Sequence, residues 1–331
     1  MSTPKSTLIL SGAEVARAMP HTRFNEFVDT VFKEWGGGGV VMPPKVNLDM
    51  ARGGHGSWCN AMPAFVANHG AAGIKWIGGF PANPPRGMPY IRGVIVLTDP
   101  ENGDTLAVMD GSYISDWRTG ASAAVATRYL ANPGPLAVAM VGAGGQGKTA
   151  SVCLHQMFPD LRLTAVGRNA GRLERFRAEV ADLCGLEART TTDVEAACRD
   201  ADVIVLLTTA KEPFIRREWI KPGALALAMG SYPHLTDDAL RLFDRIVVDS
   251  WGQAAHRGEL KGPAEAGVIT EKDIAAELGM VAAGLVEGRT RVDERVLGVL
   301  VGLGAHDVYA ATQVYRAAKE QGLGMEVALG S

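Results

Sequence analysis

Three glycines at fixed spacing form the clearest chemical motif of the chain: Gly142, Gly144 and Gly147. An apolar run, Leu136–Val141, precedes them, and a helical segment from about Gln146 to Phe158 follows. Between a strand and a helix, such glycines make a tight turn, expose bare backbone to a pyrophosphate and bring the helix close to the strand. The pattern predicts a dinucleotide site formed by Gly142, Gly144, Gly145, Gln146 and Gly147; a glycine-rich turn without a ligand is the alternative.

The end of the next strand indicates which dinucleotide binds. NAD sites usually place an acidic residue there for the ribose 2′-hydroxyl, whereas NADP sites place a cation near the 2′-phosphate. No Asp or Glu stands between Val166 and Arg172; the residues available for contact are instead Arg168, Asn169 and Arg172. These residues suit a phosphate dianion and favour NADP(H), with NAD(H) possible. Solvated arginines at a helix start are the alternative.

Three cations are conspicuous in the first part of the chain. Lys45 follows two prolines, Lys75 lies in the apolar run Gly73–Ile77, and Arg118 precedes an alanine-rich segment. A lysine inside an apolar strand must either reach solvent or point into a polar cleft. Beside a hydride-transfer cofactor, three such cations would suit an α-carboxylate substrate, although a solvent-facing lysine at position 75 stays open.

The elements that must position these residues follow from the apolar pattern. Short apolar runs indicate strands at Leu136–Val141, Leu163–Val166, Val203–Leu207, Ala224–Met229 and Arg245–Val248. Between them, one apolar helix face is formed by Leu173, Phe176, Val180 and Leu183. Alternating strands and helices predict an α/β fold with a Rossmann-type, doubly wound parallel sheet.

Two domains are expected. The turn-rich segment 131–135 separates a Gly- and Pro-rich first part from the α/β region. A final helix at 305–321, with an apolar face of Val308, Ala311, Tyr315 and Ala318, ends before Gly322 and should pack back onto the first part. We therefore predict a Rossmann domain at 131–304 and a discontinuous α+β substrate-binding and dimerisation domain at 1–130 plus 305–331.

Composition excludes several partners and reactions. The 331 residues are 47% hydrophobic and 21% charged, with a net charge of 33 − 36 = −3, so neither nucleic acid nor an anionic membrane is expected as a partner. Four scattered cysteines fit a reducing, cytoplasmic compartment, without disulfides or structural zinc. No metal site is expected, because metal and hydrolase motifs are lacking and His55, His69, His234 and His256 have no ligand-like spacing.

Ordered motifs along nearly the whole chain resemble those of the ornithine cyclodeaminase/mu-crystallin family. They are Pro44-Lys45, Gly73-Ile74-Lys75-Trp76, Asp110-Gly111, Arg118-Thr119-Gly120-Ala121, Val141-Gly142-Ala143-Gly144, Gly230-Ser231, Val248-Asp249-Ser250, Gly258-Glu259-Leu260, and Asp307 with the closing helix. The family includes cyclodeaminases, alanine dehydrogenases, imino-acid reductases, opine-type synthases and a binding protein with imine reductase activity. The resemblance also implies a homodimer formed through the sheet of the first domain.

Site residues follow from the same resemblance. It implies that Lys45, Lys75 and Arg118 hold the substrate carboxylate, that Lys75 assists acid–base chemistry, and that Met62 lines the pocket, although core packing would also explain Met62. Near the cofactor it implies Thr208, Thr209, Met229, Ser231 and His306. Ser231 would also face the substrate.

One departure bears on the reaction. Cyclodeaminases of the family carry an aspartate two residues before a proline, where this chain has Ser231 before Pro233. A serine holds no negative charge near neutral pH and cannot replace a carboxylate as general base. The leading hypothesis is therefore an NAD(P)H-dependent reductase of an α-imino acid. A cyclodeaminase that releases ammonia, a non-catalytic NADP(H)-dependent binding protein and alanine dehydrogenase-like chemistry remain alternatives.

Overall fold

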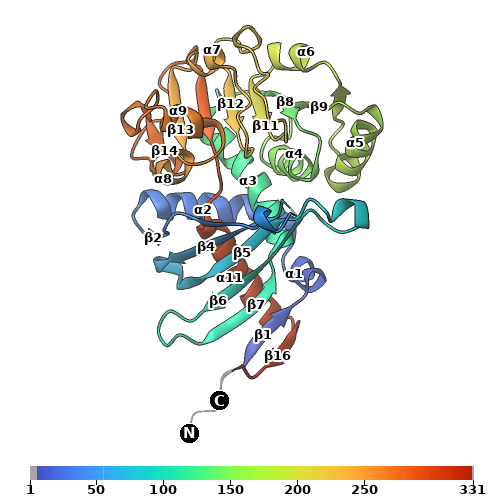
Figure 1. Cartoon of the computed structure of the whole chain (residues 1–331), viewed down its shortest axis with the longest axis vertical. Helices are drawn as coiled ribbons and strands as arrows, with labels where there is room; N and C mark the ends of the chain where they lie inside the picture. The colour runs from blue at the N-terminus through green and yellow to red at the C-terminus, as the bar shows by residue number, and fades with distance from the viewer. Residues whose placement is uncertain (1–5, 55, 330–331) are drawn as a thin grey trace. The chain divides into compact units, whose positions relative to one another are not determined.

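In the computed structural model, which describes residues 6–54 and 56–329, the chain separates into two units (Figure 1). The first contains the chain up to Arg118 and again from Leu303; the second is Thr119–Gly302. The border falls inside helix α3 (Ser112–Leu130), and the turn-rich segment 131–135 lies within the second unit. His55 lies outside the described residues.

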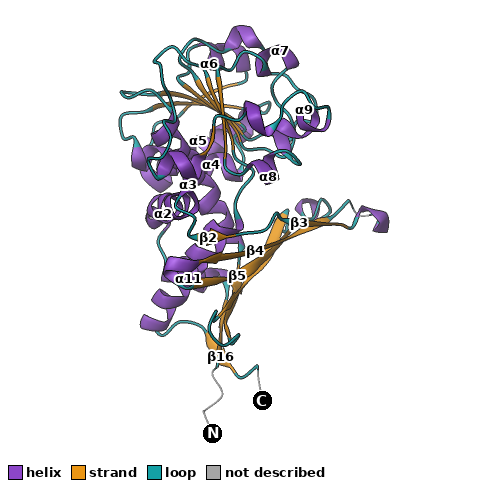
Figure 2. Ribbon diagram, turned by 90° about the vertical axis from the view of Figure 1, so that its left-hand side faces the viewer, coloured by secondary structure: helices purple, strands orange, loops and turns teal. Residues whose placement is uncertain are grey.

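The first unit is built around a mixed sheet, sheet A, in the order β16-β1-β7-β6-β5-β4-β2, with β3 paired to β4. Its strands are β1 (Thr7–Leu10), β2 (Val40–Val41), β3 (Val46–Asp49), β4 (Trp58–Val66), β5 (Ala71–Gly79), β6 (Ile91–Thr98), β7 (Thr105–Asp110) and β16 (Met325–Val327). Its helices besides α3 are α1 (Gly12–Ala18), α2 (Phe24–Gly36) and α11 (Gly304–Glu320). Helix α11 packs on β4, β5 and β6, and α2 packs on α11 (Figure 2).

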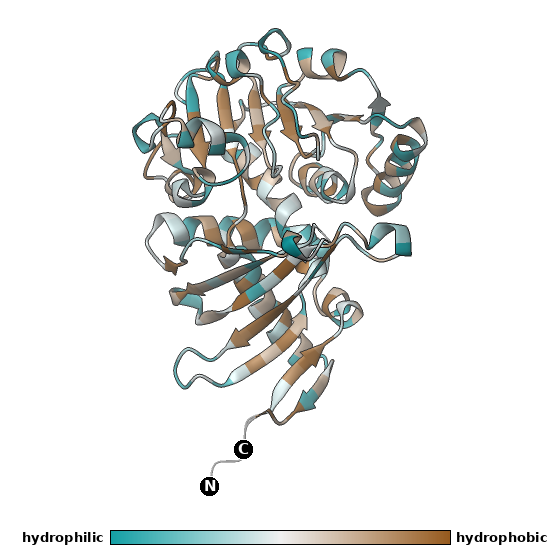
Figure 3. Cartoon of the chain, in the orientation of Figure 1, coloured by the Kyte–Doolittle hydropathy of each residue, from teal (hydrophilic) through white to brown (hydrophobic). Residues whose placement is uncertain are grey.

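Sheet A has two different faces because side chains alternate along each strand. On β4, Met62 and Ala64 are buried, whereas Ala61 and Pro63 between them are partly exposed. Brown, hydrophobic segments recur along the strands of sheet A in Figure 3. Helix α11 covers the face that carries Met62.

The second unit has an all-parallel sheet, sheet B, in the order β10-β9-β8-β11-β12-β15-β13-β14 within the described residues. Its strands are β8 (Ala137–Val141), β9 (Arg162–Val166), β10 (Arg189–Thr191), β11 (Val203–Leu206), β12 (Leu225–Ala228), β13 (Arg245–Val248), β14 (Ala276–Glu277) and β15 (Val296–Val299). Its helices, on both faces in Figure 2, are α4 (Gly145–Met157), α5 (Ala170–Cys184), α6 (Val194–Arg199), α7 (Asp237–Leu240), α8 (Trp251–Ala254), α9 (Lys261–Glu265) and α10 (Leu278–Ala282). This confirms the Rossmann-type fold.

Some details of the helices and strands differ from those predicted from the sequence. Leu183 is exposed in the last turn of α5, although it lies two turns after the buried Phe176 on the same side of the helix. Tyr315 is only partly buried on α11, whereas Val308, Ala311 and Ala318 are fully buried. Strands β10, β14 and β15 were not predicted. The last of them lies in the middle of sheet B, between β12 and β13.

The described residues show neither a membrane-spanning helix nor a metal cluster. None of their helices combines the length and the hydropathy needed to cross a membrane. No three His, Cys, Asp or Glu side chains among them gather as a metal site. The four cysteines are free thiols, and burial raises the pKa of each.

Candidate functional site

The glycine loop between β8 and α4 has the packing of a nucleotide-binding turn. Gly142 has φ +124°, and a Cβ there would lie 2.8 Å from the carbonyl carbon of Leu207. A Cβ on Gly147 would lie 2.1 Å from the backbone oxygen of Gly142. The first and third glycines are therefore required for the turn itself and for the close approach of helix and strand.

The second glycine has the opposite surroundings. Gly144 and Gly145 are exposed, and a Cβ on either would have no neighbour within 4 Å. Gly144 is the N-cap of α4, so the unpaired N–H groups of the first turn, which includes Gln146, face this open space. Room beside bare backbone at a helix N-terminus fits a pyrophosphate. The residues present therefore suit a dinucleotide.

The end of β9 is positively charged. Arg168 and Arg172 are exposed, and no described residue forms an ion pair with either. Asn169 caps α5, and its Oδ1 accepts a hydrogen bond from the backbone N–H of Arg172 at 2.9 Å. The positive end of the helix dipole and the cation Arg172 lie together at the N-terminus of α5. An anion bound here would be stabilised by both of these positive charges.

The loops after β11 and β12 are held together by a buried pair. Glu259 accepts hydrogen bonds from the backbone N–H groups of His234 and Leu235 at 2.8 and 3.0 Å. The His234 Nε2 lies 3.3 Å from the backbone oxygen of Thr208, which lies next to Gly142. His234, expected to be a surface or a satisfied histidine, is therefore fully buried and links the two loops.

Predicted residues on these loops are accessible. Thr209 and Ser231 are exposed, and Thr208 and Met229 are partly exposed. The Ser231 Oγ accepts a hydrogen bond from Arg257 Nη2 at 2.9 Å. The serine that replaces the family's aspartate therefore lies beside a cation.

Lys75 projects from the covered face of sheet A into the first unit. It pairs across the strands with Met62 on β4 and Ile95 on β6, and all three side chains are buried. Gly73, two residues earlier on this face, has the backbone oxygen of Val96 within 2.3 Å of its Cβ position. The alternative of a solvent-facing lysine is wrong: Lys75 is 0% exposed.

A carboxylate on α11 binds Lys75 and Arg118 together. The Lys75 Nζ lies 2.7 Å from Asp307 Oδ2, and the Arg118 Nε donates to Asp307 Oδ1 at 3.1 Å. The Lys75 Nζ also donates to the Ser115 Oγ at 3.3 Å. Gly304 allows this arrangement, because a Cβ there would lie 2.9 Å from the Met62 backbone oxygen. We call Lys75, Ser115, Arg118 and Asp307 the buried ion cluster.

Burial and charge shift the pKa values in and beside the cluster. Burial and the neighbouring Arg118 lower the pKa of Lys75 to about 8, although Asp307 acts in the opposite direction. Burial alone would raise the pKa of Asp307, but Arg118 and Lys75 hold it below its ordinary value. The neighbouring His306 has a pKa lowered to about 3 by burial and by Arg118, so it is neutral. Asp307 therefore contacts both cations of the cluster.

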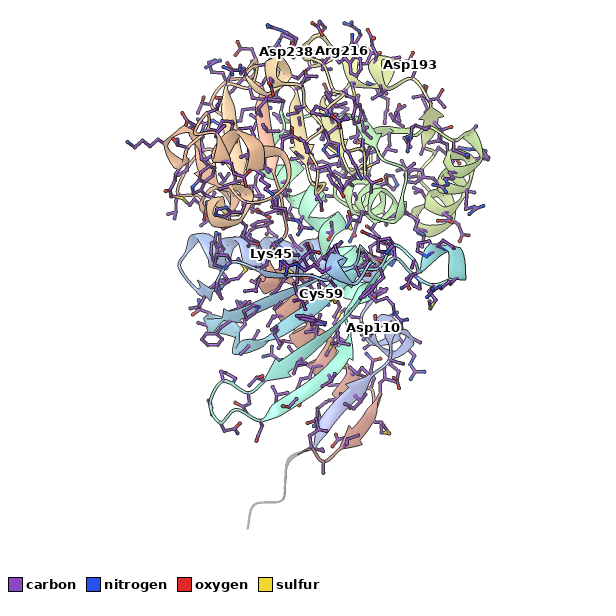
Figure 4. All side chains as sticks on the ribbon, viewed as in Figure 1. Lys45, Cys59, Asp110, Asp193, Arg216 and Asp238 are labelled. Atoms are coloured by element: carbon purple, nitrogen blue, oxygen red, sulfur yellow. The ribbon has the colours of Figure 1, made fainter. Side chains whose placement is uncertain are left out.

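The other predicted residues of the first unit have different positions. Lys45, labelled in Figure 4, is partly buried one residue before β3, and the antiparallel pairing of Val46 with Ala61 directs it toward Met62. His306 is buried with its ring against Phe32, at 4.5 Å between centroids. Contact of His306 with a cofactor stays a prediction.

Sequence reasoning did not assign a role to Asp307 or Ser115. Asp307 entered only as part of a family motif, and Ser115 precedes Arg118 by three residues on the same helix face. The 3-residue spacing on α3 was a usable signal for Ser115. Nothing local indicates that Asp307, on the last helix, would meet Lys75.

Comparison with known proteins extends these observations. The model of the ornithine cyclodeaminase/mu-crystallin family matches residues 5–322. Alanine dehydrogenase of Archaeoglobus fulgidus is 32% identical over 325 residues, which cover 97% of this chain and 98% of that protein.

Two solved structures share the fold over nearly the whole chain. One is the Δ1-pyrroline-2-carboxylate reductase of Thermococcus litoralis in complex with NADH and L-proline, at TM-score 0.91, 28% identity, and 97% and 100% coverage of the two chains. The other is an archaeal alanine dehydrogenase dimer with bound NAD, at TM-score 0.91, 32% identity, and 98% and 100% coverage. The chain belongs to the ornithine cyclodeaminase/mu-crystallin family, and it is an NAD(P)-dependent oxidoreductase.

Proposed function

We propose that the protein is an NADPH-dependent reductase of an α-imino acid, taken up as a ketimine or formed from a keto acid and an amine, and that it produces an amino acid. The observation that carries this proposal is the buried ion cluster, in which Asp307 holds Lys75 and Arg118 side by side. Two adjacent buried cations give a carboxylate charge-assisted, poorly screened contacts. A substrate carboxylate accepts these contacts.

Each residue of the cluster has a distinct part in this reaction. A bound reduced nicotinamide supplies the hydride. Arg118 and Lys45 anchor the carboxylate by charge-assisted hydrogen bonds. Lys75, which uses two of its three donors on Asp307 and Ser115, has a third for the substrate and can deliver a proton to its nitrogen.

The preference for NADPH rests on the end of β9. Arg168 and Arg172 supply two guanidinium groups where an NAD-specific site would have an acidic residue. NAD(H) stays a possible cofactor, and the two related structures described above contain it. Parallel titrations with NADPH and NADH test the preference.

Ser231 supports reduction over cyclodeamination. With a serine hydrogen-bonded to Arg257, this loop lacks the carboxylate that could activate an amine or a water. NADPH consumption should be measured with keto acids, with and without amines, and with cyclic imines, while ammonia is assayed in parallel. Stoichiometric NADPH consumption supports the proposal. Ammonia release from a diamino acid with only catalytic cofactor would overturn it.

A homodimer through sheet A is part of the proposal. The face of sheet A opposite Lys75 exposes Val46, Leu48, Trp76 and Val94, with Trp76 and Val94 each 40% exposed. These residues lie on β3, β5 and β6, and Ala61 on the intervening β4 connects them, since it pairs with both Val46 and Trp76, and Trp76 pairs with Val94. A contiguous apolar sheet face is typical of a subunit interface.

A further inference from the structure

Asp307 is the one carboxylate that the described structure places in contact with both cations of the buried ion cluster. We propose that Asp307 is a positioning residue of the reaction: it holds Lys75 as a charged, oriented proton donor and leaves Arg118 to anchor the substrate. This inference rests on the proposed function, because it assigns a task to Lys75 in imine reduction.

Each oxygen of the Asp307 carboxylate contacts a different cation. Oδ2 lies 2.7 Å from Lys75 Nζ, and Oδ1 accepts from Arg118 Nε at 3.1 Å. Asp307 lies in the first turn of α11, where the helix dipole stabilises a negative charge. Since Asp307 is fully buried, its charge acts on Lys75 with little screening by water.

The other groups around Lys75 make Asp307 necessary. From α3, Arg118 repels the ammonium charge, Ser115 contributes only a neutral hydrogen bond, and the exposed Asp116 adds a weaker attraction. From α11, His306 is neutral. Without Asp307, burial and Arg118 together would favour the neutral amine of Lys75, which cannot donate a proton.

A hydride adds to the imine carbon, the C=N π electrons move to nitrogen, and that nitrogen takes a proton from the Lys75 ammonium. The imine is reduced and the nicotinamide is oxidised. Lys75 is left as a neutral amine, which solvent reprotonates, and Asp307 favours that reprotonation.

The pH profile of Asp307→Asn is the first test. The alkaline limb of kcat/KM should move to lower pH by about one unit or more, because an opposite charge at this distance shifts a pKa by that amount. At neutral pH, kcat should fall while KM stays unchanged or falls. Asp307→Glu should keep the limb in its original place. A limb that stays at its wild-type pH in Asp307→Asn would refute the proposal.

Two matched variants separate this effect from general damage. Ser115→Ala removes the neutral partner of Lys75 and should leave the limb unmoved. Thr312→Val removes a buried hydroxyl that bonds to Val308 on the same helix and should leave both rate and limb unchanged. If Asp307→Asn does not fold, Asp307→Glu and Ser115→Ala are compared instead. Because Asp307→Glu keeps the negative charge beside Lys75, a limb that moves to lower pH in that variant contradicts the proposal.

Calorimetry tests the inference without turnover. Pyruvate binding to wild-type protein near neutral pH should take up almost no proton. In Asp307→Asn it should take up as much as one proton per site, because the bound carboxylate recharges a neutral Lys75. Proton uptake equal to that of the wild type would refute the inference. If the wild-type protein reduces no imine but Asp307→Asn still takes up a proton on pyruvate binding, the inference about Asp307 holds and the proposed reaction is rejected.

Discussion

The backbone oxygen of Gly142 occupies the place where a side chain at Gly147 would begin, 2.1 Å from the Cβ position. Gly147→Ala should therefore lower the melting temperature markedly, since neither backbone segment can move without opening the turn. Gly144→Ala should leave stability nearly unchanged, because its Cβ meets nothing within 4 Å, yet weaken NADPH binding. Thermal unfolding and cofactor titration of both variants check this contrast. Equal stability losses would contradict it.

Lys75 should set the alkaline limit of activity. Its pKa of about 8 means that the ammonium is present below this pH and is lost above it, so kcat/KM should fall about tenfold per pH unit beyond it. Lys75→Ala should lower turnover by roughly 10²–10⁴-fold, the usual contribution of a proton donor. Lys33→Ala, which breaks only a surface ion pair with Asp29, is the control. Wild-type rates in Lys75→Ala would overturn the assignment.

Cofactor choice should depend on Arg168. Arg168→Asp should weaken NADPH binding by roughly 10–100-fold, the loss of one charge-assisted contact, and change NADH binding far less. The exposed Arg175, further along α5, gives the matched control Arg175→Asp. Dissociation constants for both cofactors measure the effect, and equal losses for both would count against an NADP site.

His306 should make the protein acid-sensitive. Its pKa is about 3 in the folded chain and near 6.5 when unfolded, so the unfolded state takes up the proton first as pH falls. Stability is complete above pH 6.5 and declines toward pH 3, by at most about 1.4 kcal/mol per pH unit. Asp307, also shifted downward, contributes only below its ordinary value of 3.8.

Urea unfolding between about pH 4 and 7 covers this window, in which His21, whose pKa burial also lowers, contributes as well, so only the change on His306→Leu reports on His306. His306→Leu should flatten the decline, and the exposed His256→Leu should not. A slope unchanged by His306→Leu would show that other groups cause it.

The exposed face of sheet A should hold the dimer together. Trp76→Glu places a charge in the centre of this face and should shift the sedimentation of the protein toward monomer. Val292→Glu, at a site 77% exposed in the second unit, is the control. Unaltered association of Trp76→Glu would place the interface elsewhere.

Local patterns predicted what depends on neighbours in sequence. The strand Arg245–Val248 has the predicted bounds, and the glycine loop lies between the predicted strand and helix. Strand β15 was not predicted from the sequence because Gly298 interrupts its apolar run. Packing against a residue distant in sequence requires this glycine, since a Cβ at position 298 would lie 2.6 Å from the Leu227 side chain.

The same limit applies to the site. The lysine in an apolar strand indicated a candidate functional residue. Its counter-charge, Asp307, lies on the last helix α11, and no local pattern connects Lys75 with Asp307. Burial of both groups is a property of the assembled unit. Their pKa shifts could therefore not be predicted from residue type.

The strand orders determine when this chain can fold. Strand β15 separates β12 from β13, and β1 pairs with both β7 and β16, so each sheet waits for a segment made late in synthesis. Until residues 296–299 leave the ribosome, β12 and β13 each have an unpaired edge open to wrong partners. These few pairings therefore form after the others, and until then the growing chain carries open sheet edges that chaperones would shield.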